Sequence, residues 1–386
     1  MKKVLLKVVA IIMAISTVFA SSVMPSCSAV PDKSGQNQIV KKTPLLDENG
    51  ALVEPGYCVT NMYEYDRSAI KAGKTRIKEW DFYQVSNERY LMQVTIADIS
   101  IASAVTVGIK DMQTGANYST MILKLFTFGK LNLSSDAMNP HSYSFHKGKF
   151  NLDINVTKEK RTIEFHGKAS GKNFDMNLTM DMLPDHESLV MAVPFDTKKN
   201  DHFYYNQKVN CMATTGTVKV GKIDAEFKGM EDDSYCVLDW GRGVWPYHEV
   251  WWWGNGSKTL YDDKGNPHIF GWEIGWGFGD MSAASENTLF YDGKAHKIGN
   301  LTLENEKQVV KNWTGTKWII SDGDEGRFYM EMTPTFDNIT RLRFLFVGNI
   351  CHQVFGKWNG WVVLDDGTKL EIKDMMSFLE RSDNMW

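Results

Sequence analysis

The sequence predicts an all-β protein built mainly from antiparallel strands. Apolar and polar residues alternate over residues 150–156 and 174–182, which is the spacing of strands that bury one face. Short turn-forming stretches link these runs to a third strand at residues 161–166, whereas parallel strands would need longer crossovers. Helical periodicity is scarce along the whole chain. We therefore expect two β-barrel or sandwich domains.

The N-terminus is typical of a secretory signal peptide, which we expect over residues 1–26. Lys2 and Lys3 supply positive charge, and the apolar run at residues 8–20 is too short to span a bilayer. Small residues around Ala20 suit a signal peptidase, whereas Cys27 suits lipid attachment. Both alternatives stay open. In either case we expect export, to the cell envelope or beyond, with membrane contact only through a lipid on Cys27.

The rest of the 386-residue chain is longer than one hydrophobic core usually serves. We expect a polar tether at residues 27–43, an N-terminal β domain at 44–208 and a C-terminal β domain at 209–386. The boundary is placed there because residues 194–207 are polar and rich in turn formers.

Composition argues against several classes of function. The net charge is −4 and no basic stripe occurs, so we expect no nucleic-acid partner. Beyond Cys27, the cysteines are widely separated and form no C-x-x-C pair, which argues against a zinc or thioredoxin site; they are Cys58, Cys211, Cys236 and Cys351. Disulfides and buried free thiols both remain open. We expect no cofactor.

Tryptophan is concentrated in one segment, because seven of the 13 tryptophans lie between residues 240 and 276. Such rings supply rigid walls for a ligand, although a packed core is the alternative for each of them. In an extended chain Trp251 and Trp253 share one face and Trp252 takes the other. The candidate ligand-binding rings are Trp245, Trp251, Trp253 and Trp276.

Ionisable residues are interleaved with these rings. Carboxyl groups against indole faces lose solvation, which raises their pKa toward the range that acid catalysis requires. We therefore predict His248 and Glu273 as proton donors and Asp239 as the residue that organises a catalytic turn. Arg242 is a candidate ligand contact, although a salt bridge to Asp239 is the simpler interpretation. His248-Glu249 begins like a zinc-protease motif, but position 252 is Trp, so we expect no metal.

Two elements are predicted near the C-terminus. Residues 361–364 and 370–372 should form a hairpin around the Asp365-Asp366-Gly367 turn. Residues 373–380 are predicted to form a short helix, with Met376, Phe378 and Leu379 as its apolar stripe.

The segment Leu238-Asp239-Trp240-Gly241-Arg242-Gly243, the run 251–253 and the later Gly271-Trp272-Glu273-Ile274-Gly275 resemble a widespread bacterial family of unknown function. The N-terminal half agrees, through Leu45-Leu46-Asp47 and residues 76–81. The family is distantly similar to tandem lipocalin-like proteins, including AttH-like proteins, carotenoid 1,2-hydratase, kievitone hydratase and fungal Diels–Alder cyclases. The resemblance implies two lipocalin-like domains that enclose an apolar ligand, with Asp239, Trp251 and Trp253 at the pocket. Trp240 stands where those enzymes often carry His or Arg.

Three functions remain open at this stage. The first is an exported protein that binds an apolar or amphipathic small molecule, or a lipid, in a Trp-lined pocket. The second is a cofactor-free hydratase, isomerase or cyclase that acts on an unsaturated lipid or isoprenoid by acid catalysis. The third is a purely structural Trp core.

Overall fold

Strands dominate the protein, as the alternating sequence predicts. The computed structural model describes residues 34–195, 201–344 and 347–385, so the predicted signal peptide and Cys27 lie outside the described residues. Within them the α-helix is α2 (Glu306–Val309), and short 3-10 turns occur at η1 (Arg67–Ala69), η2 (Lys74–Arg76) and η3 (Gly229–Glu231). None of the helices in these ranges has the length and apolar character needed to cross a membrane.

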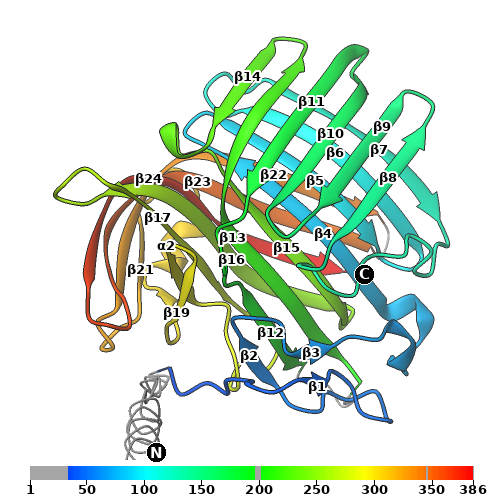
Figure 1. Cartoon of the computed structure of the whole chain (residues 1–386), viewed down its shortest axis with the longest axis horizontal. Coiled ribbons are helices and arrows are strands. Elements are labelled where there is room, and N and C mark those ends of the chain that lie inside the picture. The colour runs from blue at the N-terminus through cyan, green and yellow to red at the C-terminus, as the bar shows by residue number, and fades with distance from the viewer. Residues whose placement is uncertain (1–33, 196–200, 345–346, 386) are drawn as a thin grey trace, which may run out of the picture. The chain divides into compact units, whose positions relative to one another are not determined.

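The first sheet has 13 strands, and all of its pairs are antiparallel (Figure 1). Its main path runs β7-β6-β5-β4-β15-β13-β11-β10-β9-β8. The strands of this path are β4 (Ile77–Ser86), β5 (Tyr90–Asp98), β6 (Ala102–Asp111), β7 (Asn117–Leu125), β8 (His141–Lys147), β9 (Phe150–Val156), β10 (Lys160–Ala169), β11 (Lys172–Asp181), β13 (Phe203–Val220) and β15 (Tyr235–Val244). Beside the path lie β2 (Gly56–Cys58), β12 (Leu189–Pro194) and β14 (Ile223–Lys228). A separate parallel pair joins β1 (Thr43–Pro44) to β3 (Tyr63–Glu64).

The predicted three-stranded meander is confirmed as β9, β10 and β11. Ile163 of β10 lies opposite Ile154 on one side and Leu178 on the other, and all three side chains are buried. The alternation seen in the sequence therefore reflects one face of the first sheet packing against its core.

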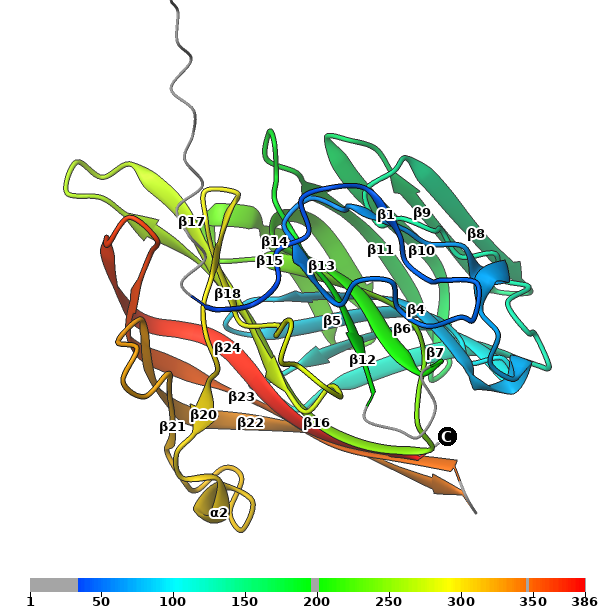
Figure 2. The same cartoon turned by 90° about the horizontal axis from the view of Figure 1, so that it is seen from below.

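The second sheet has nine strands in the order β19-β18-β17-β16-β24-β23-β22-β21-β20 (Figure 2). They are β16 (His248–Tyr261), β17 (Pro267–Trp276), β18 (Thr288–Tyr291), β19 (Lys294–Lys297), β20 (Thr302–Leu303), β21 (Trp318–Ser321), β22 (Phe328–Phe344), β23 (Val347–Val363) and β24 (Lys369–Met385). The predicted C-terminal hairpin is confirmed, since Val362 of β23 pairs with Leu370 of β24.

The chain passes from the first sheet to the second between Val244, where β15 ends, and His248, where β16 begins. Residue 208 lies inside β13, whose neighbours β11 and β15 belong to the same sheet. The sheets therefore divide later along the chain than the predicted domain boundary. The polar stretch at residues 194–207 leads from β12 into β13, and these two strands pair with each other.

The prediction of a short C-terminal helix is wrong, because residues 373–380 belong to β24. Met375 and Leu379 enter the core of the second sheet, whereas Phe378 enters the core between the sheets. Asp374 has a φ of 48°, and the register shifts near it. A strand that buries both faces and contains a bulge loses simple alternation, so its apolar spacing resembled that of a helix.

Three clusters of buried side chains result. One cluster packs against the first sheet, one packs against the second sheet, and a third joins the facing surfaces of the two sheets. The third cluster combines Tyr204 of β13 and Trp245, which follows β15, with Trp253 of β16 and Phe355 of β23. The candidate site lies in this layer.

The cysteines outside the N-terminus are free thiols rather than disulfides in the described chain. Cys58, Cys211 and Cys236 are buried, and burial raises the pKa of each thiol to about 12. They therefore behave as small apolar residues.

Candidate functional site

A cavity of about 390 Å³ lies between the two sheets. Its aromatic wall, as the term is used below, consists of Trp80, Phe82, Tyr204, Trp245, Trp251 and Trp253. The polar groups that reach the same cavity include Gln93, Lys208, Asp239, Asn349, Gln353 and Glu380. Strands of both sheets supply these residues, so the cavity exists only when the sheets are packed together.

Strand alternation decides which side chains of β15 and β16 face the cavity. On β15, Asp239 lines the cavity, whereas Trp240 belongs to the core of the first sheet. On β16, Trp251 and Trp253 line the cavity, whereas Trp252 belongs to the core of the second sheet. This is the alternation expected from the sequence, and whether the rings bind a ligand stays a prediction.

Lys208 of β13 is the centre of a buried charged cluster at one side of the cavity. Its Nζ lies 3.3 Å from Asp239 and 3.5 Å from both Glu273 and Glu286. The same ammonium lies 4.1 Å from the centre of the Trp253 ring. Tyr204 donates a hydrogen bond of 2.9 Å to Glu286, and Asn206 donates one of 2.6 Å to Asp239.

Carboxyl groups outnumber the ammonium in this cluster. Burial raises the pKa of both Glu273 and Glu286, although the Lys208 ammonium opposes both shifts. Carboxylates gathered around one ammonium in a buried site repel one another, so ionising all of them carries a large energetic cost. The cluster therefore retains a proton near neutral pH.

Glu380 of β24 forms a second acidic group on the cavity wall. Gln353 donates a hydrogen bond of 3.2 Å to its Oε2, and no ion pair of Glu380 occurs among the described residues. Burial raises the pKa of Glu380 to about 7, while hydrogen bonds from Cys351 and Trp251 oppose the shift. A carboxyl group that is half protonated near pH 7 can donate or accept a proton.

Two of the residues predicted from sequence lie away from the cavity. The His248 side chain is 52% exposed at the start of β16 and pairs with Asp383 at 3.0 Å, which places the predicted proton donor on the surface. Trp276 stacks on Trp252 with ring centres 5.9 Å apart, on the other side of the second sheet. Strand alternation places His248 on the face opposite Trp251 and Trp253. Within the described residues β16 contains no bulge that would bring His248 to their face.

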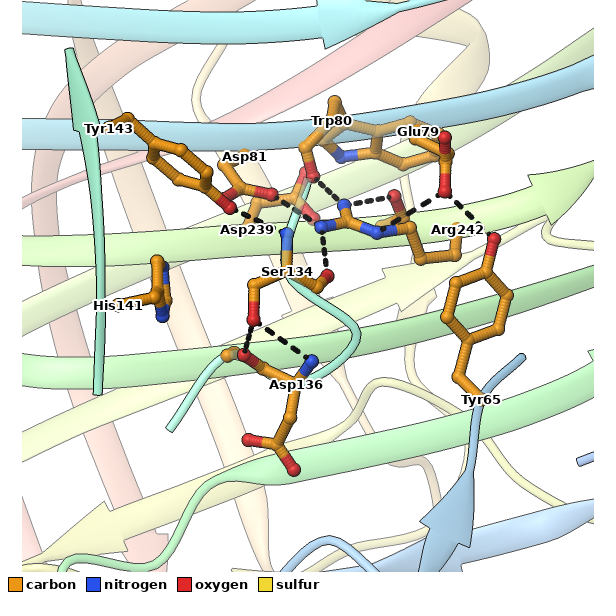
Figure 3. Close-up of polar contacts among 12 residues, drawn as sticks. Tyr65, Glu79, Trp80, Asp81, Ser134, Asp136, His141, Tyr143, Asp239 and Arg242 are labelled. Atoms are coloured by element: carbon orange, nitrogen blue, oxygen red, sulfur yellow. Dashed lines mark hydrogen bonds and ion pairs between the residues drawn. The ribbon is translucent and has the colours of Figure 1, made fainter. Parts of the chain in front are cut away.

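Arg242 does not line the cavity, and its buried side chain lies beside Glu79, Asp81 and Ser134 (Figure 3). Its guanidinium pairs with Asp81 at 2.9 Å, lies 3.8 Å from Glu79 and donates to the carbonyl oxygen of Ser134 at 2.7 Å. Its Cζ lies 3.9 Å from the centre of the Trp240 ring. The predicted salt bridge to Asp239 is absent from these contacts, because Asp239 and Arg242 project from opposite faces of β15.

Glu273 is buried directly behind the aromatic wall. The Trp253 indole N–H donates to its Oε1, and Asn255 donates to its Oε2 at 3.0 Å. Among the predicted acids, Asp239 thus reaches the cavity itself, whereas Glu273 acts on it through Trp253 and Lys208.

Sequence reasoning missed Lys208, Glu286 and Glu380. No local signal marks Lys208, because Asn206, Gln207 and Asn210 make this stretch polar in the sequence, although residues 203–212 are all buried in β13. Charged residues inside such a strand are rarely buried without partners. For Glu380 the mistaken helix concealed the alternation that points it to the cavity.

The fold and cavity define an all-β protein with two antiparallel sheets and an aromatic-walled cavity between them. The family model described as "Domain of unknown function (DUF2804)" matches residues 36–386, and the chain belongs to this family. The predicted resemblance to a family of unknown function is thereby confirmed.

Solved structures with a similar chain course include CghA, at 10% identity and a TM-score of 0.46, with 89% of this chain and 97% of that chain covered. Kievitone hydratase from Nectria haematococca matches at 9% identity and a TM-score of 0.44, over 89% of this chain and 98% of that chain. An AttH-like protein from Nitrosomonas europaea matches at 10% identity and a TM-score of 0.38, over 82% of this chain and 95% of that chain. No curated protein sequence matches the chain. Similarity at this level does not carry an activity from those proteins to this one.

Proposed function

We propose that the protein binds an apolar or amphipathic small molecule in the cavity between its sheets. The observation that carries this proposal is the combination of an aromatic wall with a few buried polar groups around one cavity. Ligand pockets typically have volumes of roughly 300–1,000 Å³ and this mixture of surfaces. The cavity volume of about 390 Å³ falls in that range.

The residues that line the cavity offer contacts for both the apolar and the polar part of an amphipathic ligand. Trp80, Trp245 and Trp251 supply apolar area, with ring centres 5.7 Å apart between Trp80 and Trp245 and 5.3 Å apart between Trp245 and Trp251. Asp239 and Glu380 supply hydrogen-bonding groups to fix the orientation of a polar end. A dry core would not leave such groups facing an open volume.

Titration with the neutral fluorescent probe N-phenyl-1-naphthylamine tests this function, using energy transfer from tryptophan as the signal. Trp251→Ala should weaken binding by about 1–3 kcal/mol, the scale expected when an aromatic side chain is removed from a desolvated pocket. Trp276→Ala is the matched control, because it removes an indole from the opposite side of the sheet. Equal losses in both variants, or no saturable binding by the wild type, would contradict the proposal.

Acid catalysis is the second candidate function. It is favoured by the buried Glu380 carboxyl that lines the cavity. The protonated carboxyl would transfer its proton to one carbon of a C=C bond, and the Trp rings would stabilise the cation that forms on the other carbon. Water would then add to that carbon, and the proton that it loses would return to the Glu380 carboxylate. Transfer of a proton from a neighbouring carbon to the Glu380 carboxylate would give an isomer instead. Attack by a second C=C bond would close a ring and move the cation, which the same proton loss to Glu380 would then neutralise.

The two candidates separate by turnover. Geraniol, an unsaturated isoprenoid alcohol, can be incubated with the protein in H₂¹⁸O and analysed by mass spectrometry. An enzyme would incorporate ¹⁸O into a hydrated product, and Glu380→Gln would abolish incorporation while it leaves probe binding within about twofold, as expected for an interaction made in the transition state. If geraniol is recovered unchanged, the binding proposal stands and acid catalysis on this substrate is contradicted.

We also propose that the chain is exported and lipidated at Cys27. The support is the order of charges, apolar run, cysteine and polar tether in the first 43 residues. Labelling with a fatty-acid probe should modify the wild type and leave Cys27→Ala unlabelled. An unlabelled mature protein whose first residue is Ser21 would instead indicate free secretion.

A further inference from the structure

The charges around the cavity do not balance within the described chain. Asp239, Glu273, Glu286 and Glu380 are carboxyl groups that line the cavity or lie directly behind its lining. Among the described residues that line the cavity, Lys208 is the one with a positive side chain. Arg242, the next cation along β15, is fully buried on the opposite face of that strand and is already paired. The cavity therefore presents excess negative charge whenever these acids ionise.

The aromatic wall is also arranged to receive positive charge. The Lys208 ammonium already sits 4.1 Å from the centre of the Trp253 ring. The planes of Trp80 and Trp245 meet at 57°, and those of Trp245 and Trp251 meet at 58°, so the rings form angled walls rather than a parallel stack. Indole faces set at an angle around a space are the arrangement that binds quaternary ammonium groups.

We propose that the cavity selects an organic cation, namely an ammonium group carried on an apolar body, whose charge is balanced by Asp239 and Glu380. This inference rests on the proposed binding function and names the class of ligand. It is carried by the cavity, its angled indoles and the surplus of carboxyl groups together.

Glu380 distinguishes this ligand class from a neutral one. A buried carboxylate with no ion-pair partner among the described residues is costly, so without a ligand Glu380 holds its proton to a higher pH than an exposed carboxyl does. A bound ammonium group supplies the missing partner, and the carboxyl then ionises and releases its proton to solvent. A neutral ligand brings no charge to compensate, and an anion would meet the carboxylates of the wall with like charge. The cavity should therefore prefer cation, then neutral molecule, then anion.

Two probes of the same shape test the preference. Phenyltrimethylammonium and tert-butylbenzene differ by nitrogen in place of the central carbon and by one positive charge. Each is titrated against N-phenyl-1-naphthylamine prebound to the folded wild-type protein at pH 7. We expect phenyltrimethylammonium to bind about tenfold more tightly, the scale of a desolvated cation–π contact with an adjacent carboxylate.

Matched variants test whether the carboxyl groups of Glu380 and Asp239 cause the preference for the cation. Glu380→Gln keeps the shape and removes the charge, and should reduce the preference to about threefold or less. Glu371→Gln makes the same change in net charge on the same strand, but its side chain is 71% exposed and should leave the preference intact. Asp239→Asn provides a second variant if Glu380→Gln folds poorly.

The outcomes separate this inference from the function on which it rests. If tert-butylbenzene displaces the probe as well as the cation does, the cation inference is overturned while ligand binding stands. If the naphthylamine itself does not bind the folded wild type, the proposed function fails and the inference fails with it. A preference that survives unchanged in both Glu380→Gln and Asp239→Asn also overturns the assignment to these carboxyls.

Discussion

The indole N–H of Trp253 donates a hydrogen bond to Glu273, and this contact joins the cavity wall to the charged cluster behind it. Glu273 is completely buried, so its carboxyl oxygens depend on Trp253, Asn255 and Lys208 for partners. The ring that faces the ligand site is therefore held in place by the same carboxyl group that pairs with Lys208. Substitutions of Glu273 or Lys208 should therefore affect the Trp253 ring that lines the cavity.

Trp253→Phe tests this coupling, because it keeps an aromatic ring and removes the N–H donor. The Glu273 oxygen would lose one partner in a buried site, which costs about 1–3 kcal/mol of unfolding free energy. Urea denaturation measures the loss. The double variant Trp253→Phe/Glu273→Gln should not lose the full sum of the single effects, since the residues are in contact. Strict additivity would show that the contact contributes nothing.

Lys208→Met should destabilise the protein in a pH-dependent way. It leaves Asp239, Glu273 and Glu286 without their shared cation, and removing one partner of a buried ion pair costs about 3–5 kcal/mol. The cost should be smaller at pH 5 than at pH 8, because protonated carboxyls need no counter-charge. Lys219→Met is the control on the same strand: the Lys219 side chain is 62% exposed, and the change should stay within about 0.5 kcal/mol. A loss of stability that does not depend on pH would contradict the role of Lys208 as the shared cation of these carboxyl groups.

His248→Gln should have little effect on either stability or binding. The His248 side chain is about half exposed, and its pair with Asp383 is a surface interaction worth roughly 0–1 kcal/mol. Chemical denaturation and N-phenyl-1-naphthylamine titration check both expectations. A large loss of probe binding would return His248 to the site, as the sequence first suggested.

The sequence was informative wherever the relevant pattern is local. Alternation placed Trp251 and Trp253 on one face and Trp252 on the other, and the turn at residues 365–367 located the β23–β24 hairpin. These features depend on neighbouring residues and on backbone geometry, which a single sequence carries.

The charged cluster depends instead on pairings between distant parts of the chain. Lys208 reaches Glu273 and Glu286 because β13 packs near β17 across the two sheets, and nothing near residue 208 encodes that approach. Glu380 was hidden for a different reason, since β24 is covered on both faces and lacks strict alternation. Chemistry assembled across two sheets is thus the part that local patterns miss.

Glu380→Gln should change how stability depends on pH. In the folded protein burial raises the pKa of Glu380 from its ordinary value of 4.5 to about 7. The groups that face it are Lys208, Asp239 and Cys351, of which Lys208 opposes the shift and Asp239 adds to it. Below pH 4.5 the carboxyl is protonated in both the folded and the unfolded chain and costs nothing.

Between pH 4.5 and about 7 the unfolded chain releases this proton while the folded chain keeps it, so the unfolding free energy falls by about 1.4 kcal/mol per pH unit for this group. Above about pH 7 both states are ionised and the accumulated loss, about 3 kcal/mol, stays constant. The Gln side chain cannot titrate. The variant should therefore gain stability relative to the wild type from pH 4.5 upward and reach a plateau above pH 7. Urea denaturation from pH 4.5 to 8.5 measures the difference, with the exposed Glu371→Gln as a control that should show no such rise. Parallel stability curves for the wild type and Glu380→Gln would mean that the carboxyl is ionised in the folded protein, and that the cavity carries its negative charge even when empty.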